Sequence, residues 1–243
     1  MSEADAAVLA GPSFTEFRSA GDLHRTLADE IVARLSAAVA RRGAASFVVP
    51  GGTTPGPFYD VLSQREAPWA DVTVVPSDER WTERGSERSN EHLTRTRLMR
   101  SKAAGLRLVP FKTAHAAAKD AEDAVQDAVA AAPRPFDVVL LGMGNDGHTA
   151  SLIPGASGLA GALDTASPAL VRAISPPDLA ALGERMTLTL RALLDARWIV
   201  LLIRGEAKRA AYERAMAGTD ILAAPVRAVL RQSGTPVSVY WSA

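Results

Sequence analysis

Two residues with complementary proton chemistry, Asp146 and His148, lie two positions apart in a glycine-rich stretch of the sequence. They follow an apolar run, residues 138–141, of the kind that a strand buried on both faces requires. In open α/β folds, side chains that follow such a strand lie at the carboxyl edge of the sheet, where ligands bind. An imidazole beside a carboxylate at that edge indicates general acid–base chemistry.

The glycines around this pair also match a dinucleotide-binding pattern. Gly142, Gly144 and Gly147 have the spacing G-x-G-x-x-G. That motif requires a long helix that opens at the third glycine, and Pro154 follows Gly147 too soon for one. Asp146 would also bring a negative charge to the pyrophosphate. We therefore disfavour nucleotide binding.

A second glycine-rich loop follows another apolar run, residues 46–50, and consists of Gly51, Gly52, Thr53 and Thr54. Glycines let the backbone approach a ligand closely, and the hydroxyls and free N–H groups at a helix start favour an anion. Taken alone, the pattern is more typical of an ordinary strand-to-helix turn with Thr54 as the helix N-cap.

Charged residues follow two further expected strands. Asp78 and Arg80 come soon after the apolar run 72–76, and Lys208 lies in the first turn of the helix expected after residues 198–203. Charges packed at a strand end need partners or a ligand. A lysine at a helix start opposes the helix dipole unless a bound anion reverses the sign. Solvated surface charges are the alternative interpretation of both features. An amide at Asn90 is a weaker candidate for the same cleft.

The rest of the pattern alternates strands and helices, which predicts an α/β fold with a mostly parallel sheet and helices on both faces. We expect helices at residues 23–40, 54–63, 91–99, 114–131 and 206–217, and strands at 46–50, 72–76, 136–142, 198–203 and 237–241. Residues 156–182, rich in Gly, Ala, Ser and Pro, are expected to be loop-rich. No long linker divides the chain, so we expect a single domain over residues 1–243.

Composition gives no support to several kinds of partner, although it does not exclude a local basic pocket. The chain carries 27 basic and 27 acidic side chains, so nothing in its net charge favours nucleic acid or an anionic membrane. It has no cysteine, and no second histidine lies at ligand spacing to His148, so we expect no metal site. With neither a signal-peptide pattern nor an apolar run of membrane-spanning length, we expect a soluble, cytoplasmic protein. We also expect a monomer.

Taken together, the motifs resemble those of 6-phosphogluconolactonases, over about residues 14–241. The resemblance rests on Gly51-Gly-Thr-Thr-Pro, Ser77-Asp-Glu-Arg-Trp, Ser89-Asn, Leu141-Gly-Met-Gly-Asn-Asp-Gly-His-Thr-Ala-Ser-Leu-Ile-Pro-Gly, Arg185-Met-Thr-Leu-Thr and Gly205-Glu-Ala-Lys. It implies a Rossmann-like three-layer α/β/α sandwich. It also implies hydrolysis of 6-phospho-D-glucono-1,5-lactone to 6-phospho-D-gluconate, in the oxidative pentose phosphate pathway, without a cofactor. Thr53 and Arg204 depart from the pattern, which commonly has serine at the first position and a small or hydroxylated residue at the second.

For such a lactonase we expect His148 to act as general base toward water, with Asp146 orienting the ring or supporting the imidazolium. Backbone amides of the Gly142–Gly147 loop are expected to stabilise the oxyanion.

The substrate's phosphate is expected to be held by Lys208 and the Gly51–Thr54 loop, with Arg80 as a further candidate. Asp78 is expected to accept hydrogen bonds from sugar hydroxyls. Whether Arg185 or Arg204 contacts the substrate is left open by the sequence.

Glucosamine-6-phosphate deaminases share most of these motifs and are the alternative enzyme. Their pattern after the histidine resembles His-Ile-Ala-Phe-Asn-Glu-Pro, whose glutamate helps to open the sugar ring. Here Ile153 stands at that position, before Pro154. We favour the lactonase because, without this carboxylate, the proton relay that opens the sugar ring is incomplete. A non-catalytic sugar-phosphate sensor is a third reading, since fold does not fix function, although the Asp146–His148 pair argues against it.

Overall fold

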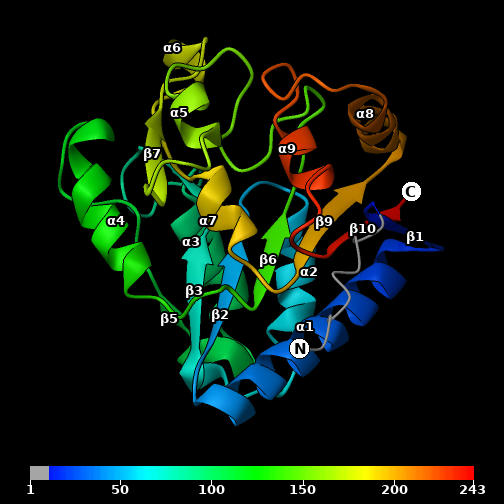
Figure 1. Cartoon of the computed structure of the whole chain (residues 1–243). Coiled ribbons are helices and arrows are strands. Elements are labelled where there is room, and N and C mark those ends of the chain that lie inside the picture. The colour runs from blue at the N-terminus through cyan, green and yellow to red at the C-terminus, as the bar shows by residue number, and fades with distance from the viewer. Residues whose placement is uncertain (1–10) are drawn as a thin grey trace, which may run out of the picture.

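A seven-stranded parallel sheet forms the centre of the protein, and the computed structural model describes residues 11–243 (Figure 1). Its strands lie in the order β1-β10-β9-β6-β2-β3-β5, and every neighbouring pair is parallel. The bounds are β1 Ser13–Phe17, β2 Ala45–Val49, β3 Val72–Pro76, β5 Arg107–Leu108, β6 Val138–Leu141, β9 Ile199–Arg204 and β10 Val237–Ser242. The apolar runs of β2 and β6 are buried along their whole length, as strands covered on both faces require.

Helices cover both faces of this sheet. Because successive side chains of a strand point to opposite faces, Phe47 of β2 packs in one core cluster and Val48 in the other. The Phe47 face is covered by α1 (Ala20–Arg42) and α2 (Pro55–Leu62), and the Val48 face by α4 (Glu122–Ala130), α7 (Leu190–Leu194), α8 (Glu206–Ala217) and α9 (Val226–Leu230). The expected three-layer sandwich with a mostly parallel sheet is therefore confirmed.

Helix α1 shows how local sequence fixes one layer. The Ser19 side chain caps its start by accepting a hydrogen bond from the backbone N–H of Asp22, at 3.1 Å. Gly43, in the left-handed conformation at φ 75°, ends it. Between them, one stripe at helical spacing is buried against the sheet: Leu23, Leu27, Ile31 and Leu35.

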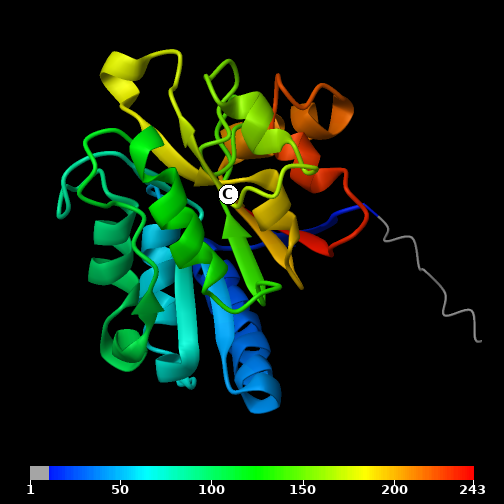
Figure 2. The ribbon, with the colours of Figure 1, turned by 60° about the vertical axis from the view of Figure 1, so that its left-hand side comes forward.

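A second, antiparallel sheet stands beyond the carboxyl ends of the large one (Figure 2). Its strands are β4 (Asp78–Arg80), β8 (Arg185–Leu188) and β7 (Val171–Ile174), and the same excursion carries α5 (Leu159–Leu163) and α6 (Leu179–Leu182). The stretch at residues 156–182 is loop-rich, as expected, but its loops join three short elements that the sequence did not indicate, α5, β7 and α6. Elements of four or five residues are too short to produce a periodic pattern in a sequence of small residues.

The helix expected at residues 114–131 is present only in its second half. Only α4 and a short 3-10 turn, Lys119–Ala121, are helical. Before them, the Trp81 Nε1 donates to two backbone carbonyls, and the Glu184 carboxylate accepts from the N–H of Ala118 at 3.0 Å. These tertiary bonds use backbone groups that a helix would pair internally, so they override the helix propensity of alanine.

The segment expected as a helix at residues 91–99 begins as α3 (Asn90–Leu93) and continues as a π-turn, Thr94–Leu98. The N-cap is Ser89, whose hydroxyl accepts from the N–H of His92 at 3.1 Å.

The strand order places a crevice between β2 and β6. These strands are neighbours, but the chain leaves β2 toward β3 and leaves β6 toward β9, in opposite directions along the sheet. Such a switch point opens a ligand-binding crevice at the carboxyl ends of the strands. The loops after β2 and β6 carry the candidate residues. Within residues 11–243, no helix is long and apolar enough to cross a membrane.

Candidate active site

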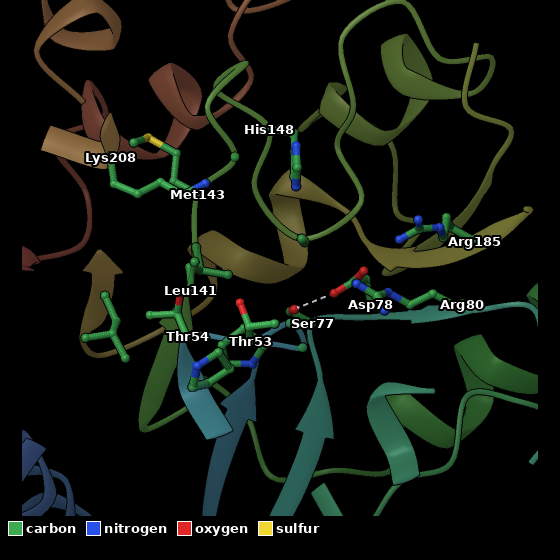
Figure 3. A pocket seen from close by; sticks show the side chains of 18 residues that line it. Thr53, Thr54, Ser77, Asp78, Arg80, Leu141, Met143, His148, Arg185 and Lys208 are labelled. Atoms are coloured by element: carbon green, nitrogen blue, oxygen red, sulfur yellow. Dashed lines mark hydrogen bonds between the residues drawn. The ribbon is translucent and has the colours of Figure 1, made fainter. Parts of the chain in front are cut away.

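A cavity of about 210 Å³ lies at this switch point (Figure 3). All the expected site residues except Asp146 line it, namely Gly51, Gly52, Thr53, Thr54, Asp78, Arg80, His148 and Lys208. The structure adds Arg185 from β8, and further walls from Ser77, Met143, Ala150 and Leu202. Arg204, which the sequence left open, is not among the lining residues.

Asp146 lies behind His148 and contacts it directly. Its Oδ1 is 2.7 Å from the ring Nδ1 and also accepts from the backbone N–H of His148 at 3.2 Å. An ionised carboxylate can only accept, so Nδ1 carries the ring hydrogen and Nε2 is free to take a proton. Hydrogen bonding to His148 lowers the pKa of Asp146 to about 2, so this carboxyl is ionised at neutral pH.

The glycines of the loop make room for this pair. A Cβ on Gly144 would lie 2.2 Å from His148 Nδ1 and 2.3 Å from Asp146 Oδ1. Gly147 has φ 82°, and a Cβ there would meet the Cβ of Ala224 at 2.7 Å. No helix opens at Gly147; the next one, α5, starts at Leu159. The pattern therefore serves the His–Asp pair, and the case against a dinucleotide loop holds.

Two amides of this loop are not available to an oxyanion. The N–H of Gly144 donates to the carbonyl of His148 at 2.8 Å, and the N–H of Gly147 donates to the carbonyl of Gly144 at 3.1 Å. The expectation of an oxyanion site built from these amides is wrong for both, because each hydrogen bond holds the loop in shape.

Asp78 is buried in the cavity wall and already well bonded. Its carboxylate accepts from Ser151 Oγ at 2.6 Å, Ser77 Oγ at 2.9 Å and Asn90 Nδ2 at 3.2 Å. About one of its four lone-pair positions is left for a sugar hydroxyl. Asn90 does not line the cavity, contrary to expectation. It packs behind Gly51, where a Cβ would lie 1.7 Å from its Oδ1.

Glu79 was not expected to have a structural role, yet it holds β4 to the start of α3. Its fully buried carboxylate accepts from the N–H groups of Arg80, Asn90 and Glu91, at 2.7–2.8 Å, and from Ser89 Oγ at 2.9 Å. Burial raises the pKa of Glu79, and these hydrogen bonds oppose the rise. The sequence signal for this role was a charged residue directly after Asp78. The role could not be recognised from the sequence, because most of the hydrogen-bond partners lie at the start of α3.

The loop after β2 differs from the expected cap. Thr54 has helical backbone angles, and its side chain makes no capping hydrogen bond. The turn is held from behind by Tyr59, whose buried hydroxyl donates to the carbonyl of Pro50 at 2.5 Å. The hydroxyl of Thr54 therefore does not cap the start of α2.

The cavity has a cation at each end, with His148 between them (Figure 3). At one end Lys208 is partly buried, and burial lowers its pKa while Asp146 opposes that effect. At the other, burial and the neighbouring Arg80 lower the pKa of Arg185. Arg80 Nη1 donates to the carbonyl of Arg88 at 2.8 Å, and its buried Nε has no partner within residues 11–243. An anionic ligand would stabilise either end.

No group of three or more histidine, aspartate or glutamate side chains in the described part of the chain could hold a metal ion.

The fold and cavity define a class of parallel α/β proteins with a His–Asp pair and cationic side chains at the switch point. A family model described as glucosamine-6-phosphate isomerases/6-phosphogluconolactonase matches residues 18–241. The chain belongs to this family.

Similar proteins cover almost the whole chain. The 6-phosphogluconolactonase of Rhizobium meliloti is 40% identical over 227 residues, which are 93% of this chain and 97% of that protein. That of Caulobacter vibrioides is 40% identical over 230 residues, with 93% and 95% covered. The crystal structure of a 6-phosphogluconolactonase from Shewanella baltica is 39% identical, has a TM-score of 0.93 and covers 98% of this chain and 100% of its own. A monomeric glucosamine-6-phosphate deaminase, at 16% identity and a TM-score of 0.74, shares the fold.

Proposed function

We propose that this protein is a 6-phosphogluconolactonase, which hydrolyses 6-phospho-D-glucono-1,5-lactone to 6-phospho-D-gluconate in the oxidative pentose phosphate pathway. The observation that carries the proposal is the imidazole of His148, held by Asp146 through Nδ1 at 2.7 Å, inside a cavity with cationic ends. The relatives of this name, about 40% identical over nearly the whole chain, support it.

His148 acts as the general base in this proposal. Its Nε2 takes a proton from water as the water oxygen attacks the lactone carbonyl. The bond from the carbonyl carbon to the ring oxygen then breaks, and the imidazolium returns the proton to that oxygen. Asp146 keeps the ring in the reactive tautomer and stabilises the imidazolium between the two steps. Such proton transfer contributes about 10²–10⁴-fold to the rate.

Substrate binding follows from the polarity of the cavity. Lys208 and the Gly51–Thr54 loop hold the phosphate, because the lysine charge and the open backbone suit an anion at a helix start. Asp78 accepts a hydrogen bond from a sugar hydroxyl. Arg80 and Arg185 lie at the other end, where their charge suits the lactone oxygens. Arg80 is also the alternative phosphate ligand.

The test of the base is His148→Asn, which keeps a polar side chain but cannot relay a proton at neutral pH. We expect kcat to fall at least about 10²-fold while 6-phosphogluconate binding changes little. Initial rates, corrected for spontaneous lactone opening, measure this. A kcat near that of the wild type would remove His148 from the mechanism.

The same preparation decides between the three functions. Ile153 is buried and apolar, so it cannot relay a proton in sugar-ring opening. The wild-type protein should therefore release no ammonia from glucosamine 6-phosphate while it accelerates lactone loss. Ammonia release at a comparable rate would assign the chain to the deaminases, and binding of sugar phosphates without turnover of either substrate would make it a sensor.

The proposal includes a single-domain monomer located in the cytoplasm, as expected for an enzyme of central sugar-phosphate metabolism.

A further inference from the structure

A second hollow lies at the opposite, amino edge of the large sheet. It is a groove of about 310 Å³ lined by Ala33, Arg34, Ala37, Arg41, Asp137 and Arg197. The six residues of β9 separate its Arg197 end from the start of α8, which carries Lys208, a span of about 20 Å at the usual rise of a strand. In Figure 1 the end of α1 that carries Arg41 lies at the bottom, far from the site loops at the top.

The groove follows from the sequence of α1. Arg34 and Arg41 are two helical turns apart, so they lie on the same side of the helix with their backbones about 10 Å apart. Ala37 lies between them and Ala33 directly precedes Arg34, and their short side chains leave the space that the arginines border. This side of the helix borders the buried stripe, so the groove lies where α1 meets the amino ends of the strands.

The one carboxylate of the groove is already engaged. Asp137 is buried, and its Oδ1 pairs with Arg42 and, at 3.4 Å, with Nε of Arg197. Its Oδ2 accepts from the backbone N–H of Ser46 at 3.0 Å. Asp137 thus neutralises at most one of the two arginines that it contacts.

Arg34 and Arg41 have no ion pair within residues 11–243. Instead, Arg34 stacks over Trp198, with its guanidinium carbon 4.1 Å from the ring centroid. This stacking fixes the guanidinium plane but leaves its N–H groups unpaired. Glu30, one turn earlier on α1, accepts a hydrogen bond from the Tyr240 hydroxyl at 2.7 Å. The groove therefore carries a clear excess of positive charge.

We propose that this groove is a second binding site, for a small anion that carries two phosphate groups. Guanidinium groups bind phosphate through paired, charge-assisted hydrogen bonds. Arg34, Arg41 and Arg197 all border the groove, and a diphosphate offers more oxygens to three guanidinium groups than a single phosphate does. The volume matches the lower range of small-molecule sites.

Inorganic pyrophosphate is the probe, and isothermal titration calorimetry with 6-phosphogluconate at saturation measures its binding while the active cavity is occupied. We expect Arg34→Gln/Arg41→Gln to weaken pyrophosphate binding at least tenfold. The matched control Lys102→Gln/Arg107→Gln removes the same charge at the far edge of the sheet and should change binding less than twofold. Inorganic phosphate should bind at least tenfold more weakly than pyrophosphate.

Each alternative has its own outcome. Equal weakening in the two double variants would show attraction to overall charge, and no binding to the saturated wild type would show that the groove is not a site. Pyrophosphate binding lost in Lys208→Ala but kept in Arg34→Gln/Arg41→Gln would place the anion in the active cavity. All four substituted side chains are exposed, and the lactonase activity of both double variants reports that the fold is intact.

Discussion

At the scale of single residues, the cavity is organised by Asp146. Its carboxylate hydrogen-bonds His148 at 2.7 Å and is also close enough to oppose the pKa decrease that burial causes in Lys208. One negative charge thus supports both the proposed base and the proposed phosphate ligand. Two predictions test the contact between Asp146 and His148 and the role of Lys208.

The first concerns the pKa of Asp146, which His148 lowers from 3.8 to about 2. In His148→Ala this pKa should rise back toward 3.8, and carbon NMR titration of the carboxyl measures it. Because the folded pKa is the lower one, the pair stabilises the fold above about pH 4, and this contribution is lost as pH falls toward 2. The difference between the free energies of unfolding of the wild type and His148→Ala should therefore decrease over that interval. Both groups are about half exposed, so we expect less than about 1 kcal/mol. An unchanged Asp146 pKa in the variant would show that His148 does not cause the decrease.

The second concerns the phosphate. Lys208→Ala should weaken binding of 6-phosphogluconate by about 1.5–3 kcal/mol, as for hydrogen bonds to charged groups, and leave the weak binding of gluconate nearly unchanged. Calorimetry on both ligands measures this, with exposed Lys119→Ala as the control. If Arg80→Gln causes the larger phosphate-specific loss instead, the phosphate binds at the arginine end and the substrate lies in the reverse orientation.

At the scale of elements, the loop after β6 depends on a missing side chain. Gly144→Ala would place a Cβ 2.2 Å from His148 Nδ1, so the ring must leave Asp146. We expect kcat to fall at least about tenfold, since both tautomer and orientation are lost. Gly161→Ala in α5 is the control, because a Cβ there would meet only Arg172 Nε, at 3.8 Å, and Gly161 does not line the active cavity. Equal effects of the two substitutions on kcat would show that the loss does not come from the contact between His148 and Asp146.

At the scale of the whole molecule, the two sheets are joined closely enough to unfold together. β4 follows β3 after one residue, and Ser77 between them accepts from the N–H of Leu188 on β8, at 2.8 Å. Trp69 and Trp241 lie in the core clusters on opposite faces of the large sheet. In urea we therefore expect tryptophan fluorescence and far-ultraviolet circular dichroism to report one coincident transition.

Light scattering of the native protein should give the mass of one chain, 25.6 kDa. A second unfolding transition would show that the three-stranded sheet unfolds as a separate unit. A mass twice that of one chain would show a dimer instead of a monomer.

The sequence by itself determined the parallel sheet, the helices on its two faces and the loops that face the site. These depend on local signals: apolar runs for buried strands, helical spacing for α1, and glycines with polar residues after β2 and β6. Since the carboxyl ends of parallel strands meet at one edge, the candidate residues could be collected in one cavity from the sequence alone.

Only the tertiary structure decided the contacts between distant segments. Arg185 reaches the cavity because β8 pairs with β4, a pairing between residues about a hundred positions apart that no local pattern encodes. Glu79 and Asn90 do not line the cavity, because their hydrogen-bond partners lie on neighbouring elements. Residues 114–118 do not continue α4 because Trp81 and Glu184 bond their backbone. In each case a long-range hydrogen bond outweighs a local preference of a fraction of a kcal/mol per residue, about 0–0.7 for ordinary helix formers.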